Sequence, residues 1–181
     1  MTNSHFTELK KELQKGVTDA EHPFRYCTMA TVGLDRMARL RTVRVRSVSD
    51  DMAISIYTDK RSKKIIHIKE NKLVSMLFYH PDKLLQLKVE GMAVINKDQK
   101  LLKKLWKDID TPSKKDYTTA MAPGSVVERP EQVEYLKEED YFCLLEVHPF
   151  KIEYLKLRRP GHLRIRFSRQ EDDWRSEFLV P

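Results

Sequence analysis

The stretch Arg39–Arg46, which reads RLRTVRVR, places four arginines on one predicted β-strand. Arginines are interleaved there with aliphatic and β-branched residues, and successive side chains of a strand point to opposite faces. We therefore expect Thr42, Arg44 and Arg46 on one face. Arg41 and the two valines would lie on the other. Guanidinium groups on both faces fit either a charge-protected edge strand or a strand that binds anions.

Further strand patterns occur on both sides of this stretch, separated by short turn sequences rich in Gly, Pro and Asp. The predicted strands are Phe24–Val32, Met37–Val48, Met52–Thr58, Leu73–Tyr79, Leu84–Ile95, Tyr141–Val147, Lys151–Leu157, His162–Phe167 and Trp174–Leu179. Many strands, short turns and few helices indicate a mainly β fold with peripheral helices, in which the strands form a closed or nearly closed antiparallel barrel.

Helical spacing of apolar residues is confined to four segments. The first is a short amphipathic N-terminal helix at residues 4–15, which we expect to pack loosely. The others are Arg61–Asn71, Lys97–Ile109 and Pro130–Glu138, the last beginning with a proline in its first turn. The connection Thr111–Arg129 is longer than most loops of compact domains and is a candidate functional loop.

The composition is that of a basic globular protein. The 181 residues include 34 Lys and Arg against 27 Asp and Glu, a formal net charge of +7. This length predicts a single domain over residues 1–181, and the charge favours an anionic partner. The charged N-terminal segment and the lack of a long apolar run predict neither a signal peptide nor a membrane span. The widely separated Cys27 and Cys143 favour buried thiols in the cytoplasm.

Several common kinds of site are disfavoured by the sequence. The five glycines are scattered, so neither a dinucleotide fingerprint nor a P-loop is present, and any phosphate must be held by side chains. The six histidines lack the spacing of metal ligands, and we expect no metal site. Ser125 lacks the second glycine of a nucleophile elbow, which makes serine hydrolase chemistry improbable.

The stretch Tyr57–Lys64, YTDKRSKK, leaves a predicted strand and enters a predicted helix. It brings hydroxyl groups, several cations and a helix N-terminus together, a combination suited to binding phosphate. An ordinary helix start with a solvated basic turn explains the same residues. The nearby arginine-rich strand shifts the balance towards anion binding.

Several motifs occur in an order and spacing that resemble the pyridoxamine 5′-phosphate oxidase-like family of FMN-binding split barrels. They are Arg41–Arg46 (RTVRVR), Tyr57-Thr58 (YT), Ser62–Lys64 (SKK), Gln86–Gly91 (QLKVEG) and His162–Arg166 (HLRIR), with Trp174 and the terminal Leu179–Pro181 after them. The resemblance covers roughly residues 24 to 181. Each motif is weak alone, and their ordered set is fairly specific. The resemblance implies an antiparallel split barrel.

The resemblance also implies a homodimer with FMN at the subunit interface. The cofactor residues carried over by position are Arg41, Thr42, Val43, Arg46, Tyr57, Thr58, Ser62, Lys63, Lys64, Gln86 and Arg166. Of these, Arg41 and the backbone at Val43 would meet the isoalloxazine and ribityl portions, and the residues from Tyr57 to Lys64 would hold the phosphate. Gln86 would reach the flavin of the other subunit. Arg166 would lie near the ring, where positive charge favours the reduced flavin.

The chain departs from the family at the expected substrate site. Where pyridoxamine phosphate oxidases hold the substrate phosphate with Tyr, Arg and Ser, this chain has Trp106, Asp110 and Lys114. Because an aspartate would repel phosphate, a B6 vitamer is not the expected substrate. The family's closing Arg-x-His pair is His162 and Arg164 in swapped order, and we assign these two residues to the substrate.

The leading hypothesis is an FMN-dependent oxidoreductase that transfers a hydride from a small-molecule substrate to flavin N5, with the protein supplying binding, orientation and electrostatics. No side-chain nucleophile is needed, so no catalytic side chain is assigned. One alternative is a carrier or sensor that holds FMN without turnover. A true pyridoxamine or pyridoxine 5′-phosphate oxidase and a nucleic-acid-binding barrel are less favoured, the latter because acidic residues are spread throughout and no basic tail occurs.

Overall fold

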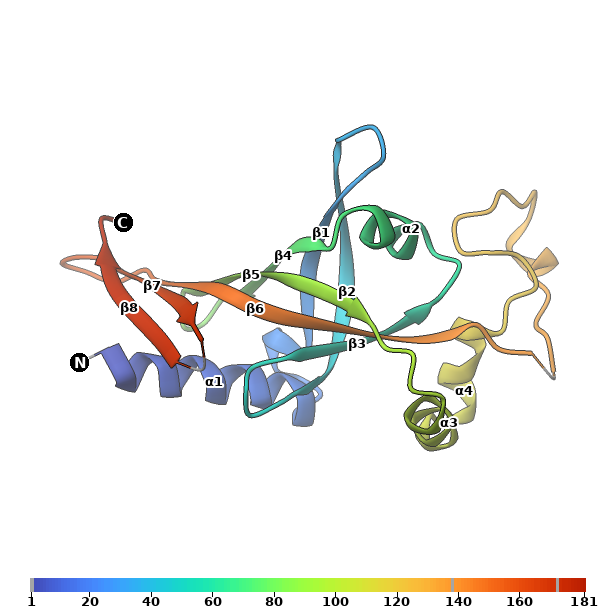
Figure 1. The fold of residues 1–181 in the computed structure, drawn as a ribbon, viewed down its shortest axis with the longest axis horizontal. Helices are drawn as coiled ribbons and strands as arrows, with labels where there is room; N and C mark the ends of the chain where they lie inside the picture. Colours follow the sequence, from blue (N-terminus) through green and yellow to red (C-terminus); the bar gives the residue numbers. More distant parts are fainter. Residues whose placement is uncertain (1, 138, 172) are drawn as a thin grey trace.

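The computed structural model describes all residues except 1, 138 and 172. Its strands form one antiparallel sheet in the order β3-β2-β1-β4-β5-β6-β7-β8, and a further pairing of β3 with β6 closes the first six into a barrel (Figure 1). The strands are β1 Tyr26–Val32, β2 Ala38–Val48, β3 Ile54–Asp59, β4 Leu73–His80, β5 Leu85–Ile95, β6 Phe142–Lys156, β7 Leu163–Gln170 and β8 Asp173–Leu179. The mainly β barrel predicted from the sequence is confirmed.

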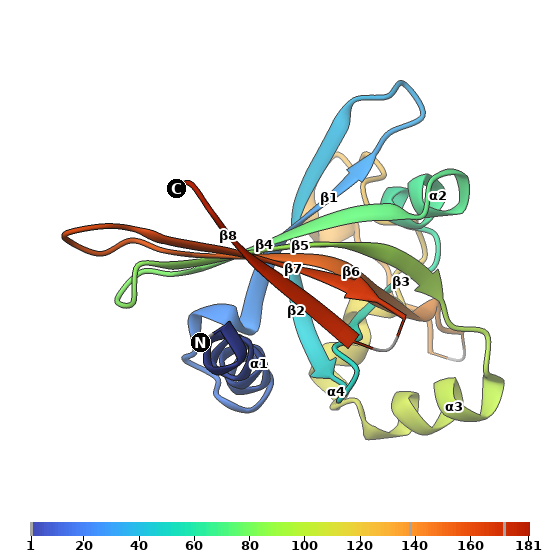
Figure 2. The ribbon, with the colours of Figure 1, turned by 60° about the vertical axis from the view of Figure 1, so that its left-hand side comes forward.

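Strand β6 is continuous where the sequence predicts two strands, Tyr141–Val147 and Lys151–Leu157. Pro149, which has no N–H to donate, lies opposite Gly91 where the pairing with β5 shifts register. A Cβ on Gly91 would come within 2.6 Å of the His148 carbonyl oxygen, so the close approach of the two strands needs glycine here. The first half of β6 pairs with β3 and its second half with β7. One long strand therefore joins the barrel to the β7–β8 hairpin, which lies at the end of the molecule away from α2 (Figure 1) and crosses in front of the barrel strands in Figure 2.

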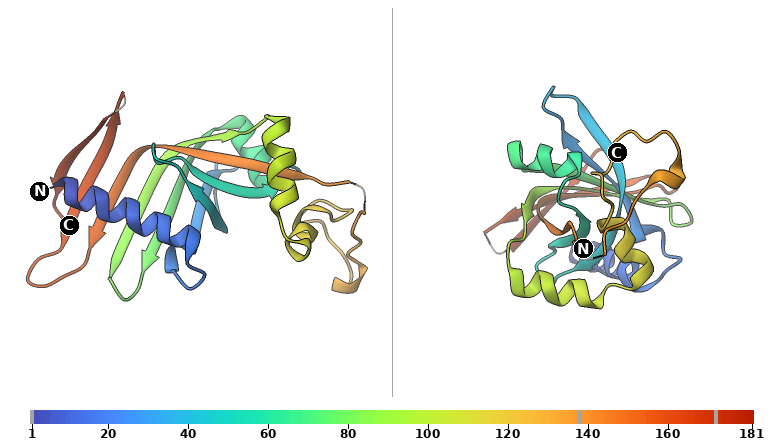
Figure 3. Two further views of the ribbon diagram at one scale, coloured as in Figure 1. Left: turned by 90° about the horizontal axis from the view of Figure 1, so that it is seen from below. Right: turned by 90° about the vertical axis from the view of Figure 1, so that its right-hand side faces the viewer.

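The N-terminal helix is longer and better packed than predicted. Helix α1 spans Thr2–Thr18 rather than residues 4–15, and Leu9 and Leu13 are fully buried. The ring of Phe6 packs against aromatic side chains of β7 and β8. The expectation of loose packing was wrong, because helix α1 lies along the sheet and covers it (Figure 3).

The remaining helices lie at turns between strands. They are α2 Lys63–Glu70, α3 Gln99–Asp108 and α4 Thr111–Lys114, with short 3-10 turns η1 Pro23–Arg25 and η2 Lys115–Tyr117. The predicted helices around α2 and α3 are confirmed, and the connection Thr111–Arg129 contains α4 and η2. Among the described helices, none has the length and apolar character needed to cross a membrane.

The predicted helix Pro130–Glu138 is wrong. In this region the structure describes only a 3-10 turn, η3 Pro130–Gln132, and residue 138 lies outside the described part. Thr119 instead forms an antiparallel bridge with Tyr135. This pairing satisfies backbone groups that a helix would have satisfied internally, so contact with the preceding connection overrides the local helical pattern.

The apolar core fills the barrel, and a smaller aromatic cluster lies beside it. Cys27 and Cys143 are free and buried, as expected for structural thiols. The smaller cluster joins Ile109, Tyr117 and Phe142 to half-buried side chains of α3 and β3. It fixes α3 and the connection after it to the end of the barrel where β3 leads into α2.

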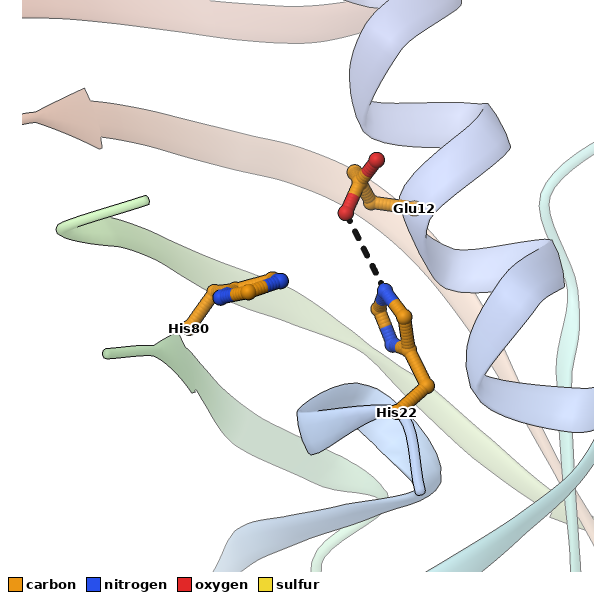
Figure 4. A group of neighbouring side chains, drawn as sticks. All are labelled: Glu12, His22 and His80. Atoms are coloured by element: carbon orange, nitrogen blue, oxygen red, sulfur yellow. Dashed lines mark hydrogen bonds and ion pairs between the residues drawn. The ribbon is translucent and has the colours of Figure 1, made fainter. Parts of the chain in front are cut away.

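A buried polar cluster anchors α1 to the barrel (Figure 4). Glu12 on α1 is only 4% exposed and accepts hydrogen bonds from His22 Nε2 at 3.1 Å and from Lys83 Nζ at 2.6 Å. His80, at the end of β4, packs edge-on against the ring of His22. Together these residues connect α1 to η1 and to the β4–β5 turn.

Glu12, His22 and His80 form the one group of metal-type ligands found together among the described residues. The hydrogen bonds do not suit a metal. His22 Nδ1 accepts from the Phe24 N–H at 3.1 Å, so its proton is on Nε2 and no lone pair faces Glu12. The Lys83 ammonium already lies where a cation would contact the carboxylate. The cluster is therefore a hydrogen-bonded anchor for the helix.

We expect Glu12→Ala to lower the free energy of unfolding by about 2–4 kcal/mol, because the His22 N–H and the Lys83 ammonium lose a buried acceptor. Urea denaturation at neutral pH measures this. The exposed Glu21→Ala is the matched control and should change the free energy by less than about 0.5 kcal/mol. Equal losses in the two variants would contradict the anchoring role.

Stability should also fall as the solution is acidified. Burial raises the pKa of Glu12, but hydrogen bonds from Lys83 and His22 outweigh it and hold the pKa below the usual value, so its contribution disappears as the pH falls through the folded-state pKa. Burial and nearby Lys83 lower the pKa of His80, so below about pH 6.5 the unfolded chain binds a proton that the folded chain does not. Denaturation at a series of pH values should therefore show stability decreasing from neutral pH to pH 4; a flat profile would contradict both assignments.

Candidate functional site

The predicted phosphate-binding residues meet where β3 turns into α2. Lys64 Nζ donates hydrogen bonds to Thr58 Oγ1 at 2.7 Å and to Ser62 Oγ at 3.2 Å. Both hydroxyl groups belong to buried residues, 5% and 4% exposed, and lie 3.4 Å apart. Because each hydroxyl oxygen accepts from Lys64, a hydroxyl proton remains to be donated to an anion.

The start of α2 adds to this arrangement. Ser62 is the N-cap residue of the helix, yet its hydroxyl makes no capping hydrogen bond and faces Lys64 instead. The N-terminus of a helix carries partial positive charge, so an anion next to Ser62 would be favoured by the helix as well as by Lys64. We call Thr58, Ser62 and Lys64 the phosphate seat.

The surroundings of the phosphate seat disfavour the charged form of Lys64. Burial is the largest cause that lowers the pKa of Lys64, and Arg41 lowers it further, with Asp59 opposing both. Arg41 is itself partly buried and donates to Thr31 Oγ1 at 2.8 Å and to the Met29 carbonyl at 3.3 Å. A dianionic phosphate would favour the charged form of Lys64, and the residues present fit the phosphate of a nucleotide-type cofactor.

Beside the phosphate seat lies a cavity of about 380 Å³, which we call the main cavity. Six of the predicted cofactor residues line it, namely Thr42, Val43, Arg46, Tyr57, Thr58 and Lys64. The guanidinium of Arg46 lies 5.0 Å from the centre of the Tyr57 ring, in cation–π contact. Arg41 and Lys63 instead line a second hollow, so these eight predicted residues are divided between two depressions.

Sequence reasoning missed part of the main cavity. Its wall also contains Tyr26, Arg44, Asp59, Ser113, Asp116, Tyr117 and Pro123. Four of these come from the connection Thr111–Arg129, the segment that its length marked as a functional loop. Two sequence features could have indicated these residues. Tyr117 is an aromatic residue in a polar connection, and Arg44 belongs to the arginine-rich strand.

Arg61 fixes this connection to the phosphate seat. Its guanidinium pairs with Asp59 at 2.7 Å and donates to the carbonyls of Thr119 and Ala120 at 2.8 and 3.1 Å. The same guanidinium stacks on the Tyr141 ring. Arg61 lies in the turn between Thr58 and Ser62, and it thus holds in place the connection that forms part of the cavity wall.

Asp110 has a structural partner. Its carboxylate accepts from the Ser113 backbone N–H at 3.1 Å and caps α4. The hydrogen bonds with Ser113 lower the pKa of Asp110, so it remains a carboxylate at neutral pH. Lys114, the third residue of this predicted group, lies over the ring of Trp106.

Four predicted residues lie away from the phosphate seat within one chain. Arg164 pairs with Glu153 at 2.7 Å and Arg166 with Glu177 at 3.1 Å, both around β7. His162 Nδ1 accepts from the Arg158 N–H at 3.2 Å, and Gln86 is at the start of β5. The β7–β8 hairpin and helix α2 lie in different regions of the molecule (Figure 1). A single chain therefore does not bring these four residues to the phosphate seat.

The closed antiparallel barrel, with cations and hydroxyls at its β3–α2 turn, defines a split barrel of the FMN-binding class. Residues 4–97 match the family described as "Pyridoxamine 5′-phosphate oxidase, FMN-binding domain". Because the match covers more than half of the 181 residues, the chain belongs to this family, and its cofactor is FMN.

Individual relatives support the same fold. Pyridoxine/pyridoxamine 5′-phosphate oxidase 2 of Arabidopsis thaliana is 29% identical over 175 residues, covering 86% of this chain and 87% of that protein. A pyridoxamine 5′-phosphate oxidase-related, FMN-binding protein of Nostoc punctiforme superposes with a TM-score of 0.78 at 21% identity, over 97% of this chain and 96% of its own. PhzG of Burkholderia lata, solved with tetrahydrophenazine-1-carboxylic acid, gives 0.79 at 22% identity, over 97% and 92%.

We expect Lys64→Met to weaken FMN binding by about tenfold to a hundredfold, because one charge-assisted contact to the phosphate is lost. Titration of the FMN-free protein at fixed ionic strength measures the dissociation constant. The matched control, Lys69→Met, removes an exposed lysine of the same helix and should leave the constant nearly unchanged. Unaltered affinity in Lys64→Met would exclude the phosphate seat.

Proposed function

We propose that this protein is an FMN-dependent oxidoreductase acting on a small molecule other than the usual B6 vitamers. The observation that carries the proposal is the buried phosphate seat opening beside a cavity lined by aromatic and arginine side chains. When bound, the flavin supplies the redox chemistry by accepting a hydride at N5. The chain then needs only to bind and orient the two partners, and the two free thiols fit a reducing compartment such as the cytoplasm.

The chain's own residues divide the work of holding FMN. The phosphate seat and Lys63 would hold the phosphate, with Tyr57 alongside. Arg41, Thr42, the Val43 backbone and Arg46 would border the ribityl chain and the ring. Positive charge in this group favours the anionic reduced flavin, which makes the site suited to hydride acceptance.

A homodimer is supported by an exposed apolar face on β1, β4 and β5. Tyr26, Leu73, Leu77, Tyr79 and Met92 are each between 41% and 53% exposed. A cluster of this kind is typical of a surface covered by a partner. Gln86 pairs with Tyr79 across β4 and β5, so its side chain belongs to the same face. A second copy on this face would carry Gln86 towards the neighbouring flavin, and Arg166, His162 and Arg164 could reach the site in the same way.

We expect the protein to sediment as a dimer and Leu77→Asp to sediment as a monomer, because a carboxylate on this face must be buried on association. The monomer should also bind FMN more weakly, since the residues of the second chain are lost. Val126→Asp, at a 92% exposed loop position, is the control for the added charge. A flavin-loaded monomer of the parent protein at micromolar concentration would contradict the interface.

Pyridoxamine 5′-phosphate should reduce the bound flavin slowly or not at all. Asp110 remains ionised where the family's oxidases have a phosphate-binding arginine, and a carboxylate about 4 Å from a phosphate is unfavourable by several kcal/mol at an effective dielectric constant near 20. Anaerobic stopped-flow mixing with this donor measures the rate. Rapid, saturable reduction at micromolar concentrations of this donor would instead indicate a B6 oxidase. In that case Lys114, Lys115 or Arg129 would take the place of the arginine.

The same apparatus tests the broader proposal. The FMN-loaded protein is mixed anaerobically with a panel of reduced heterocycles and nicotinamide donors, and flavin absorbance is followed. Saturable reduction by one donor supports an oxidoreductase. Tight retention of FMN with no reduction by any donor would instead support the carrier or sensor.

A further inference from the structure

Arg44 lines the main cavity and contains an unpaired hydrogen-bond donor. Its Nε is buried and has no hydrogen-bond partner among the described residues. An unpaired donor on a charged group is costly to bury, and native proteins rarely leave one without a ligand or partner. Arg44 was not among the residues that the family resemblance assigned to FMN. Arg44 therefore lines the main cavity, while its Nε is enclosed by protein and has no partner among the described residues.

The surroundings of Arg44 are strongly positive. Burial is the largest cause that lowers its pKa, and Arg46 and Arg25 lower it further. No ion pair in the part of the chain that the structure describes includes Arg25, Arg44 or Arg46. In contrast, Lys64 is already held by the two hydroxyl groups of the phosphate seat. The cavity wall therefore has a second cationic region besides the one that FMN phosphate would neutralise.

The neighbours of Arg44 are aromatic. Tyr26 lies directly across from it on β1, and Tyr57 and Tyr117 line the same cavity. Burial raises the pKa of the Tyr117 hydroxyl, and nearby Arg46 lowers it in part, so the hydroxyl stays neutral at physiological pH. Ring faces and neutral hydroxyls are suited to a flat organic ligand with one charged end.

Acidic residues near the cavity limit the charge that the ligand can carry. Asp116 lines the main cavity, and Asp110 is close enough to Arg46 for the two to interact. Both would repel a dianionic phosphate more strongly than a monoanion. A carboxylate matches the planar guanidinium of Arg44, whose two terminal nitrogens can donate two parallel hydrogen bonds to it.

We propose that Arg44, flanked by Arg25 and Arg46, is a substrate subsite that binds the carboxylate of an aromatic monocarboxylic acid. The proposal rests on the oxidoreductase function proposed above and names the class of its substrate. Tyr26 and Tyr117 would pack against the ring of the acid, while Tyr57 and the phosphate seat hold the cofactor. Arg44 thereby determines specificity and does not take part in hydride transfer.

The test uses benzoate as the probe and the FMN-loaded protein. Benzoate should perturb the flavin absorbance saturably, and Arg44→Met should raise its dissociation constant by about tenfold or more, as loss of a bidentate charge-assisted contact requires. Arg44→Lys keeps the charge but removes the planar guanidinium that donates two parallel hydrogen bonds, so it should also weaken benzoate binding. Arg175→Met, at an exposed position of β8, should not. FMN affinity should be nearly unchanged in the Arg44 variants.

Several results would overturn the subsite. These are equal benzoate affinity in the parent and both Arg44 variants, no benzoate binding to the parent, or tighter Arg44-dependent binding of inorganic phosphate than of benzoate. If Arg44→Met fails to fold, as judged by its melting curve, the benzoate affinity of Arg44→Lys is compared with that of the parent protein instead. If the parent takes up no FMN, the proposed function fails on that measurement alone, and calorimetry of benzoate with the FMN-free protein still tests the subsite.

Discussion

The pairing of β3 with β6 is the constraint on which the rest of the molecule depends. It closes the barrel from Ile54 opposite Val147 to Asp59 opposite Phe142. Because Thr58 lies opposite Cys143 in this ladder, its hydroxyl is fixed at the point where the chain turns into α2. The same pairing places Phe142 against Tyr57, and the aromatic cluster built on that contact holds α3 and the following connection. The phosphate seat and the cavity wall are thus consequences of how the barrel closes.

Electrostatics explain why this barrel needs an anionic cofactor. Lys64 and Arg41 both have pKa values lowered chiefly by burial. Arg41 and Lys64 also disfavour each other's charge. Burying cations without anionic partners destabilises the folded chain, and an anion that binds only the folded state offsets that cost. The excess of positive charge counted in the sequence is therefore concentrated, in part, at one functional cleft.

The sequence predicts well which residues meet when they are close along the chain, and it predicts poorly the contacts between residues far apart along the chain. Thr58, Ser62 and Lys64 lie within seven residues, so a strand followed by a helix is enough to bring them together. Tyr117 joins Arg44 in one cavity only because of tertiary packing, which no periodicity reveals. The failed helix at 130–138 has the same origin, since pairing of Tyr135 with Thr119 overrode the local pattern. Gln86 and Arg166 illustrate a further limit, because their predicted role needs a second chain.

We propose that the β3–α2 turn of this barrel binds FMN through its phosphate. The most direct measurement is the visible absorbance spectrum of the purified protein, followed by mass identification of the ligand released on denaturation. We expect a yellow protein with a flavin spectrum that releases FMN, one molecule for each chain. A colourless protein that takes up no FMN on incubation, or one that releases riboflavin without phosphate, would contradict it.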